Sequence, residues 1–595
     1  MAKKSKKGKA LKIIIGIIIV LFVLFYFWIV YPFWGMPFNA QRHGNPPLTP
    51  AWALECWLWE DDVNTAKYVD SLLSGYKKHD IPVRAIIIDS PWTWRYNDFD
   101  IDTLRYPKPD EWFTRLQNDG YRVVMWMTPN VNSYSKDAGI KNSKDWYEAA
   151  KEKGYLADNG RLVSWWKGEG GYIDYTNPEA MKWWRGLQER VYQLGIDGWK
   201  LDGSATEFFK EVLGIPIAYI GSHDGLMTTR EYMDHYYRDE YHYGLSKNPE
   251  FITLSRSMDR GFHPEGFAPI DASPVNWVGD QRHTWKSSGD KLDKNDPENK
   301  DLAMDGEEGI EEAMHDILRS AKLGYSVIGS DVAGFSGRTI PKRLYIRWAQ
   351  FSAFCGLFMN GGHGNRALWE RSKEELEIIR EYSWLHTELI PYMYSYVVSA
   401  HNGGARLQRP VDGKYHYLFG DYLLIAPIYE DSFKRAVTLP KGKWRYLFHD
   451  KQPVNGGHTL QLSFPLDEYP VFVKEGAIIP MNVSRAYTGF GSDSSAGYLT
   501  YLIYPDKKES RFVLHHPDKS GKTEISVIDK GEEISVILKG VHKPHILRLF
   551  MDSAPTSVSL DGEKIDEKEW RYDDQINKLI VKRENYKNGN YTIDK

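Results

Sequence analysis

The sequence predicts an α/β protein: a (β/α)₈ TIM barrel followed by C-terminal β-sandwich domains and preceded by one transmembrane helix. Three observations support this. Short apolar runs alternate with amphipathic stretches between residues 83 and 359, and eight runs over roughly 280 residues is the scale of such a barrel. Beyond about residue 400, short alternating strands between Gly, Pro and Asp turns take over, as in β-sandwiches. Near the N-terminus, residues 13–34 form an uncharged apolar run.

The N-terminal run has the composition of a signal anchor. Lysines crowd the first twelve residues, and no comparable basic cluster follows the run. About 20 apolar residues suffice to span a bilayer as a helix, and the basic flank stays in the cytoplasm. We therefore expect a single-pass membrane protein with its catalytic body exported, whether periplasmic, extracellular or lumenal. A cleaved signal peptide is the alternative, but the run ends in bulky aromatic residues and lacks a small-x-small cleavage motif.

The charge of the chain limits its possible binding partners, and changes in composition along the chain mark the other domains. A formal net charge of −4 without long like-charge blocks argues against nucleic-acid binding. The only cysteines, Cys56 and Cys355, match no metal-ligand spacing. The predicted order is a basic cytoplasmic tail (1–12), the anchor (13–34), a Gly- and Pro-containing linker (35–50), the barrel (51–400), a proximal β-sandwich (401–482) and a distal β-sandwich (483–595).

The eight predicted barrel strands end in polar residues. The strands are residues 83–88, 121–127, 171–173, 198–201, 251–255, 274–278, 325–328 and 355–359. The residues after them are Asp89, Thr128, Asp174, Asp202, Arg256, Asp280, Asp331, and Asn360 with His363. In a barrel such positions meet at the C-terminal mouth, where catalytic residues sit. A doubly wound sheet whose acids cap helices is the alternative, but it would not make so many carboxylates converge.

A cluster of carboxylates at a barrel mouth fits the hydrolysis of an acetal. That reaction needs one carboxylate to attack or stabilise the anomeric carbon and one carboxylic acid to protonate the leaving oxygen. Asp89, Asp174, Asp202, Asp280 and Asp331 are all candidates, and spacing alone does not rank them. The acidic segment 288–305 does not follow a calcium-loop pattern, so no metal site is predicted there.

Several segments resemble glycoside hydrolase family 31, in that family's order along the chain. GIDGWKLDG (195–203) resembles its nucleophile strand in the Lys-x-Asp variant, and PVNWVGD (274–280) is similar to its acid/base strand. Further matches are YIDYTNPEA (172–180), GSDVAGF (329–335), LFGDYLLIAP (418–427) and PVFVKEGAIIPM (470–481). One such match could be chance, whereas the ordered set over residues 52–481 identifies the chain as a member of the family.

The resemblance implies a retaining α-glycosidase with Asp202 as nucleophile and Asp280 as acid/base, without a metal or organic cofactor. It implies a substrate-binding role for seven further residues. Asp89 resembles the acid that binds hydroxyls of the non-reducing sugar, Lys200 and Arg256 the basic residues that bind hydroxyls or orient the carboxylates, and His363 the ring near the 2- and 3-hydroxyls. Trp126 and Trp277 are expected in the pocket wall, and Asp331 as a supporting acid. Asp174 is better explained as a cap of the following helix.

The sequence also departs from the family's pattern, and the departures bear on substrate. The β-sandwich that many members carry before the barrel has no counterpart between the anchor and residue 51, so the pocket rim is expected from other loops, such as 208–243 or 286–305. Gly203 follows the nucleophile where an acid is usual, and the turn 359–362 is MNGG. We favour an α-galactoside over an α-glucoside or α-xyloside. A transglycosylase, and a catalytically idle membrane-tethered carbohydrate-binding or regulatory protein, remain alternatives.

Overall fold

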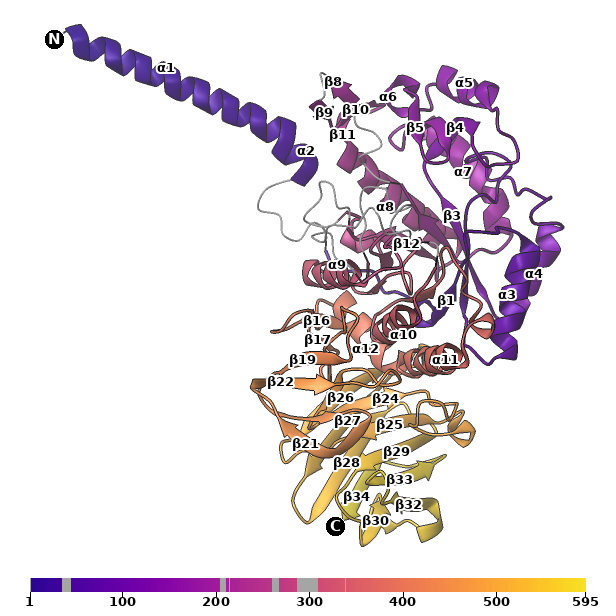
Figure 1. Ribbon diagram of the computed structural model, residues 1–595, viewed down its shortest axis with the longest axis vertical. Helices are drawn as coiled ribbons and strands as arrows, with labels where there is room; N and C mark the ends of the chain where they lie inside the picture. Colours follow the sequence, from indigo (N-terminus) through magenta and orange to yellow (C-terminus); the bar gives the residue numbers. More distant parts are fainter. Residues whose placement is uncertain are drawn as a thin grey trace.

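The computed structural model describes residues 2–34, 44–203, 210–212, 215–258, 267–285, 309–337 and 339–595. A barrel of strands wrapped by helices forms the centre of the molecule. The β-rich C-terminal part lies against one end of it, and the N-terminal helix projects away from the body (Figure 1).

The N-terminal helix consists of α1 (Ala2–Phe25), a π-helical turn (Tyr26–Val30) and α2 (Tyr31–Trp34). Its stretch Gly8–Val30 is long and apolar enough to cross a membrane, and none of its most apolar part is buried in the protein. Two hydrogen bonds join the end of the helix to the body. The Tyr31 hydroxyl donates to Glu231 Oε1 at 2.5 Å, and the Tyr219 hydroxyl donates to the Phe27 carbonyl at 2.6 Å.

Eight parallel strands form the barrel, as predicted. Their order is β14 (Ile328–Gly329), β13 (Val275–Trp277), β12 (Ile252–Arg256), β7 (Gly198–Leu201), β3 (Arg122–Met127), β2 (Ala85–Ile88), β1 (Cys56–Leu58) and β15 (Phe358–Asn360). A parallel bridge between Asp331 and Met359, with a hydrogen bond from the Val332 amide to the Met359 carbonyl at 2.9 Å, brings the two end strands together. The strands are short and almost entirely buried because helices cover them outside and side chains fill them inside.

One predicted barrel strand is wrong. Residues 171–173 lie in and just after β6 (Gly168–Tyr172), which pairs antiparallel with β4 (Asn130–Ser135) and β5 (Val163–Trp165) in a small sheet inserted after β3. The eighth barrel strand is instead β1, which pairs with β2 and β15. The barrel therefore begins earlier in the chain than the predicted strands did.

Seven helices follow individual barrel strands, and four of them begin with a side chain that caps the first amides. Thr228 and Glu231 form a capping box at the start of α8, as Ser372 and Glu375 do for α11, so the first amides of each helix are satisfied. The seven are α3 (Ala66–Lys78), α4 (Pro109–Asn118), α7 (Pro178–Gln193), α8 (Thr229–Lys247), α9 (Ile310–Leu323), α10 (Lys342–Ser352) and α11 (Lys373–Glu388). Between β12 and β13, the described residues contain only the 3₁₀ turn Ile270–Ala272.

The insertions on the barrel contain the remaining elements of the N-terminal two thirds. They are α5 (Lys144–Glu152), α6 (Ala157–Gly160), β8 (Lys210–Val212), β9 (Ile215–Ile217), β10 (Tyr219–Ser222) and β11 (Gly225–Thr228). β10 and β11 form the antiparallel hairpin that carries Tyr219, and α8 begins directly after it. The end of the N-terminal helix thus contacts the segment that leads from β7 into α8.

The C-terminal part is rich in β-structure, as predicted. After α12 (Ile390–His401), the first group of strands is β16 (Gln408–Pro410), β17 (Tyr417–Phe419), β18 (Leu423–Ile425), β19 (Lys434–Leu439), β20 (Lys443–Tyr446), β21 (His449–Asn455), β22 (His458–Ser463) and β23 (Val471–Lys474). The buried Arg347 guanidinium in α10 donates to the carbonyls of Phe464, Pro465 and Glu468, which fastens this group to the barrel.

The second group forms two further sheets. One contains β24 (Ile478–Met481), β25 (Leu499–Ile503), β29 (His545–Phe550), β33 (Lys578–Arg583) and β32 (Trp570–Asp573), and the other β26 (Ser510–His515), β27 (Lys522–Asp529), β28 (Glu533–Gly540), β34 (Asn590–Asp594), β30 (Ser557–Leu560) and β31 (Glu563–Lys564). Buried and exposed residues alternate along β27 and β28, as expected for sheets with one face in the core. The domain limits at 401 and 483 stay predictions. Cys56 and Cys355 are both buried and unbridged.

Candidate active site

A cavity of about 620 Å³ opens at the C-terminal ends of the barrel strands. Seven of the nine predicted site residues line it, and they come from six different strands or the residues just after them: Asp89, Trp126, Lys200, Asp202, Arg256, Asp280 and His363. The other lining residues are Trp59, Asp61, Ser90, Trp166, Lys167, Arg282, Phe335 and Ser336. The mouth of the barrel therefore gathers residues that are up to 304 positions apart in a single polar pocket with aromatic walls.

Asp202 is the most tightly held carboxylate in the pocket. Its Oδ2 accepts a hydrogen bond from Trp126 Nε1 at 3.0 Å, and its Oδ1 accepts one from its neighbour's amide, Gly203 N, at 2.9 Å. Arg256 adds contacts from Nε and Nη2 at 3.3 and 3.2 Å. Burial alone would raise the pKa of Asp202, but the charges of Arg256 and Lys200 together with these hydrogen bonds hold it below the ordinary value of an aspartate. Asp202 is therefore a carboxylate over the ordinary pH range.

Asp280 faces Asp202 across the Arg256 guanidinium. Nη2 of Arg256 lies 2.6 Å from Asp280 Oδ2 and 3.2 Å from Asp202 Oδ1, so these two oxygens are within about 6 Å of each other. About 35% of the Asp280 side chain is exposed, against 13% for Asp202. One carboxylate is thus buried and permanently charged, while the other reaches into the open part of the cavity.

Lys200 and Asp89 form a buried ion pair beside this couple, with Lys200 Nζ 2.8 Å from Asp89 Oδ2. Asp89 Oδ1 also accepts from the Ser90 amide at 2.7 Å. Burial would lower the pKa of Lys200, but the surrounding carboxylates, Asp89 first, raise it well above its usual value. The ammonium lies 3.8 Å from the centroid of the Trp59 ring, which adds a cation–π contact. Lys200 therefore stays charged in a pocket that is otherwise rich in acids.

Trp277 and Asp331, predicted as pocket residues, do not line the cavity. Both are completely buried beneath it. The Trp277 ring lies under the cations, 4.7 Å from the Arg256 guanidinium carbon and 5.5 Å from Lys200 Nζ. Asp331 Oδ1 accepts from Trp59 Nε1 at 3.0 Å, and burial raises the pKa of Asp331 to about 7. The two residues support the pocket floor and would reach a ligand only through Trp59, Lys200 or Arg256.

Other predictions about the site have mixed outcomes. Asp174 lies outside the cavity, as expected, but it does not cap α7. The cap is Asn177, whose side chain accepts from the Glu179 and Ala180 amides, whereas the Asp174 carboxylate accepts from Thr176 and the His223 amide in the turn before it. The expected rim segment 286–305 lies outside the described residues. The described part of the other expected segment, 217–243, does not line the cavity. The rim comes instead from β1, from the β5–β6 hairpin and from the loops after β13, β14 and β15.

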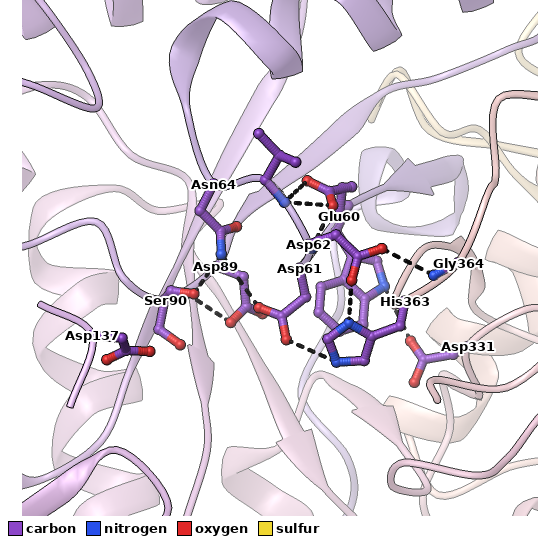
Figure 2. Close-up of polar contacts among 12 residues, drawn as sticks. Glu60, Asp61, Asp62, Asn64, Asp89, Ser90, Asp137, Asp331, His363 and Gly364 are labelled. Carbon is purple, nitrogen blue, oxygen red and sulfur yellow. Dashed lines mark hydrogen bonds and ion pairs between the residues drawn. The ribbon is translucent and has the colours of Figure 1, made fainter. Parts of the chain in front are cut away.

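The residues that sequence reasoning missed gather on this rim. Trp166 and Lys167 lie in the β5–β6 turn, where Trp166 is 43% exposed and Lys167 pairs with Asp137 at 2.9 Å. Glu60, Asp61 and Asp62 follow β1, and the last two contact His363 (Figure 2). The letters WEDD at residues 59–62 were the available signal, but they point to the pocket only once residues 56–58 are recognised as a strand.

Two other features of the described residues do not compete with this pocket. A cavity of about 680 Å³ lies at the opposite, N-terminal end of the strands, near Glu55, Arg84 and Arg122, where barrel enzymes do not place their chemistry. On α9, the ligand atoms of Glu312, His315 and Asp316 lie close enough together to hold a cation. None of these three lines the pocket.

Comparison with known families explains this arrangement of residues. The glycosyl hydrolases family 31 TIM-barrel domain matches residues 46–294 and 305–396, and the glycosyl hydrolase family 31 C-terminal domain matches residues 406–479. The chain belongs to glycoside hydrolase family 31. The resemblance inferred from the segments around Asp202 and Asp280 is therefore confirmed over more than half of the chain.

Family 31 relatives include an alpha-xylosidase of Emericella nidulans, 25% identical over 466 residues that cover 74% of this chain and 54% of that one. The alpha-glucosidase 2 of Bacillus thermoamyloliquefaciens is 24% identical over 563 residues, with 88% and 66% covered. This family 31 chain thus spans about half to two thirds of the length of these relatives. Among solved structures, the Flavobacterium johnsoniae GH31 dextranase in complex with glucose has a TM-score of 0.77 at 22% identity, with 93% of this chain and 72% of that one covered, and shares the fold.

Proposed function

We propose that the protein is a retaining α-glycosidase that hydrolyses terminal α-linked sugars, with Asp202 as nucleophile and Asp280 as acid/base. One observation carries the proposal: a single guanidinium nitrogen, Arg256 Nη2, contacts both carboxylates. Retaining glycosidases separate their carboxyl groups by about 5 to 5.5 Å, whereas inverting enzymes leave about 6.5 to 9.5 Å for a water molecule. The upper limit of about 6 Å set by Arg256 fits the retaining class.

The proposed reaction uses the different environments of the two acids. Asp202 attacks the anomeric carbon while Asp280 donates a proton to the leaving oxygen, through an oxocarbenium-like transition state. A sugar that fills the cavity excludes water from the two acids, which strengthens the electrostatic interactions among the groups around them. In the second step the oxygen of a water molecule attacks the anomeric carbon, Asp280, now a carboxylate, takes the proton of that water, and the bond to Asp202 breaks to restore its carboxylate. Two inversions return the α configuration.

The experiment that tests this function is a screen with defined products. The purified protein is incubated with nitrophenyl α-galactoside, α-glucoside, α-xyloside and α-N-acetylgalactosaminide, and NMR follows the first anomer released. We expect turnover of at least one glycoside with the α anomer formed first, and no turnover by an Asp202→Ala control. The β anomer first would contradict retention. A folded protein that binds a sugar but hydrolyses none of the four would favour the carbohydrate-binding alternative.

The reaction is proposed for one class of enzyme, but the identity of the terminal sugar is left open among three. The MNGG turn led us to favour an α-galactoside, whereas the relatives above are named for α-xylosides and α-glucosides. All three therefore belong in the screen. Transglycosylation is a second candidate, because an isomaltosyltransferase of Sporosarcina globispora is 24% identical over 89% of this chain and 50% of its own. Disaccharide products that outweigh free sugar at millimolar substrate would favour that activity.

The Arg256 contacts make a prediction about pH. The charge of Arg256 helps to hold the pKa of Asp202 below the ordinary value of an aspartate, so the nucleophile stays ionised as the pH falls and the acid limb of kcat/KM lies at low pH. Arg256→Met removes that charge, so the pKa of Asp202 rises. We expect the acid limb to move upward by about 1 pH unit or more. A shift of 1 unit corresponds to about 1.4 kcal/mol. An Arg115→Met control changes an exposed arginine on α4 and should leave the profile in place.

The pH profile is measured with an activated aryl glycoside, so that a weakened variant still gives a readable rate. If the acid limb of Arg256→Met coincides with that of the wild type, Arg256 does not keep Asp202 ionised. Thermal unfolding of both variants followed by circular dichroism separates this effect from a loss of structure.

We also propose that the N-terminal helix is a signal anchor with a cytoplasmic N-terminus and an exported body. The span Gly8–Val30 and the lysine-rich flank support this. α8 begins on the catalytic side of the barrel, because a helix that follows a barrel strand starts at the strand's C-terminal end. Since Tyr31 contacts Glu231 in the first turn of α8, the anchor would hold that side near the bilayer. Protease added to intact cells should remove the body, and carbonate washing should leave it in the membrane fraction.

A further inference from the structure

The turn after β1 directs a group of acids at the pocket. The Glu60 carboxylate accepts hydrogen bonds from the backbone amides of Asp62 and Val63, the latter at 2.7 Å, and so folds the chain back on itself. As a result Asp61 lines the cavity, with 15% of its side chain exposed, while Asp62 lies further out with 47% exposed. The geometry of this turn is thus set by a carboxylate that is not itself in the pocket.

His363 links the two aspartates (Figure 2). Its Nδ1 lies 2.6 Å from Asp62 Oδ1, and the other Asp62 oxygen accepts from the Gly364 amide at 3.0 Å. Its Nε2 lies 3.5 Å from Asp61 Oδ2. A hydroxyl group of a ligand can donate to one atom and accept from another, so it fits beside the Nε2–Oδ2 pair, which is too long for a good direct hydrogen bond. Gly361 also matters because it has no side chain. A Cβ at this position would overlap the Trp59 ring next to this group.

Asp61 has few partners of its own. Asn64 Nδ2 donates to the Ser90 carbonyl at 2.6 Å and reaches Asp61 Oδ1 only at 3.4 Å. The two lysines whose charges act on Asp61 pair with other acids: Lys200 with Asp89 and Lys167 with Asp137. Within the described part of the chain, no lysine or arginine forms an ion pair with Asp61. Burial and the charge of Asp89 accordingly raise the pKa of Asp61. The pocket therefore presents a half-satisfied carboxyl group to whatever fills it.

The order of the strands places Asp61 far from the proposed catalytic pair. Around the eight-stranded barrel, β1 is four strands from β12 in either direction, so Asp61 lies diametrically opposite Arg256. Arg256 joins Asp202 and Asp280, between which the anomeric carbon C1 must sit. In a pyranose ring, C4 is the atom opposite C1. A sugar whose C1 is at the Arg256 side therefore turns its C4 edge to Asp61 and His363.

We infer that Asp61, positioned by Asn64 and His363, is a specificity-determining residue that binds the 4-hydroxyl of the terminal sugar. The inference rests on the proposed glycosidase function, whose nucleophile fixes where C1 lies. A 4-hydroxyl that donates to Asp61 Oδ2 and accepts from His363 Nε2 satisfies both atoms at once, which places His363 beside the 4-hydroxyl instead of near the 2- and 3-hydroxyls that the resemblance implied. A sugar without this hydroxyl leaves them unpaired in a closed pocket, and sites built to bind a hydroxyl reject such analogues strongly.

The test compares each parent glycoside with its deoxy forms. The best nitrophenyl glycoside from the screen and its 4-deoxy and 3-deoxy analogues are assayed with the wild type and with Asp61→Ala, Asp61→Asn and Asp119→Ala. The wild type should lose about 30- to 100-fold in kcat/KM on the 4-deoxy analogue, the cost of leaving the buried Asp61 carboxyl and His363 without their partner. Asp61→Ala should lose a similar factor on the parent glycoside but little on the 4-deoxy analogue, so that discrimination falls at least about tenfold.

The variants also separate a role in binding from a role in folding. Asp61→Asn keeps the size and hydrogen-bonding atoms and should discriminate to an intermediate degree. Asp119, exposed at the end of α4, should behave as the wild type when changed. Unchanged discrimination in Asp61→Ala, or a loss that follows the 3-deoxy instead of the 4-deoxy analogue, would overturn the inference while leaving the glycosidase function intact.

A binding measurement covers the case in which no glycoside is hydrolysed. Quenching of tryptophan fluorescence reports sugar binding, since Trp59, Trp126 and Trp166 line the cavity. Glucose, galactose, xylose and 4-deoxy-xylo-hexose, which is the 4-deoxy form of both glucose and galactose, are titrated into the wild type and Asp61→Ala. Asp61-dependent loss of affinity for the 4-deoxy sugar without hydrolysis would refute the glycosidase function but uphold the binding role of Asp61. No binding of any of these sugars would refute both.

Discussion

Asp202→Ala is expected to lower kcat on the best glycoside by about 10⁴-fold or more while leaving the protein folded, because no other group can form the glycosyl–enzyme bond. The loss should fall on kcat rather than on KM, since the sugar still contacts Lys200, Asp89 and His363 in the cavity. Initial rates over a range of substrate concentrations, with thermal unfolding as the control for folding, measure this directly.

The same variant tests the stereochemistry by chemical rescue. Removing the Asp202 side chain leaves space beside the anomeric carbon, on the face from which a retaining enzyme attacks. A small anion such as azide can occupy that space and attack once, with one inversion. We expect azide to restore turnover of an activated aryl α-glycoside and to give the β-glycosyl azide, identified by NMR. An α-azide, or rescue of Asp280→Ala with a β product instead, would mean that the two carboxylates have been assigned the wrong way round.

The alanine variant at position 202 can be compared with the asparagine variant. Asp202→Asn keeps the size of the side chain but only one of the two oxygens that accept from Trp126 Nε1 and Gly203 N, and it removes the charge that Arg256 and Lys200 stabilise. It should be nearly as inactive as Asp202→Ala, yet it should not respond to azide because the amide fills the space. The pair of variants thus separates loss of the nucleophile from loss of packing around it.

The sequence predicted the barrel and seven of the fifteen residues that line the pocket, because local patterns mark the strand ends and the family resemblance adds the roles of the residues there. A buried parallel strand such as β2 is a short apolar run, and the residue after it lies at the mouth by geometry alone. The pattern fails where two different structures have the same composition. Residues 171–173 are an apolar run followed by an acid, like a barrel strand, but their partner is antiparallel β4. Pairing is a long-range property that the run itself does not contain.

The missed strand explains the missed acids. β1 has only three residues and follows a 3₁₀ turn, Ala51–Leu54, so nothing in its sequence sets it apart from the linker before it. Without β1, the acids at its end have no place in the fold, although one of them, Asp61, lines the pocket. Trp166 and Lys167 were missed for a different reason. They lie on the turn of a small antiparallel sheet, where no periodic pattern tells which side chains face the barrel.

Sequence reasoning also did not predict how deeply each residue at a strand end is buried. Trp277 and Asp331 lie at the ends of the expected strands, but both are buried under the floor of the cavity. Residues near the end of a barrel strand alternate between the interior and the helix layer, and one position along the strand moves a side chain by about 3.3 Å. A resemblance assigns such residues to the right strand end. It does not tell whether they touch a ligand or support the residues that do.

Asp280→Ala is expected to separate substrates by their leaving groups. A general acid contributes about 10² to 10⁴ in rate, but only where the leaving oxygen needs a proton. We expect kcat/KM for an α-glycosyl fluoride or a dinitrophenyl α-glycoside to fall less than about tenfold, and that for an alkyl α-glycoside or a disaccharide to fall by about 10³. Rates for a series of aryl glycosides of known phenol pKa measure this, and the slope of log kcat/KM against leaving-group pKa should become steeper in the variant.

The structure provides a control for this experiment in the Arg256 contact. Asp280→Asn keeps a group within reach of Arg256 Nη2 but cannot donate the acidic proton, so it should show the same leaving-group dependence as Asp280→Ala. A variant that slows all leaving groups equally would instead show that Asp280 acts only by holding Arg256 against Asp202. Because that outcome would also shift the acid limb of kcat/KM, the pH profile of the same variant distinguishes a proton donor from a residue that positions the guanidinium.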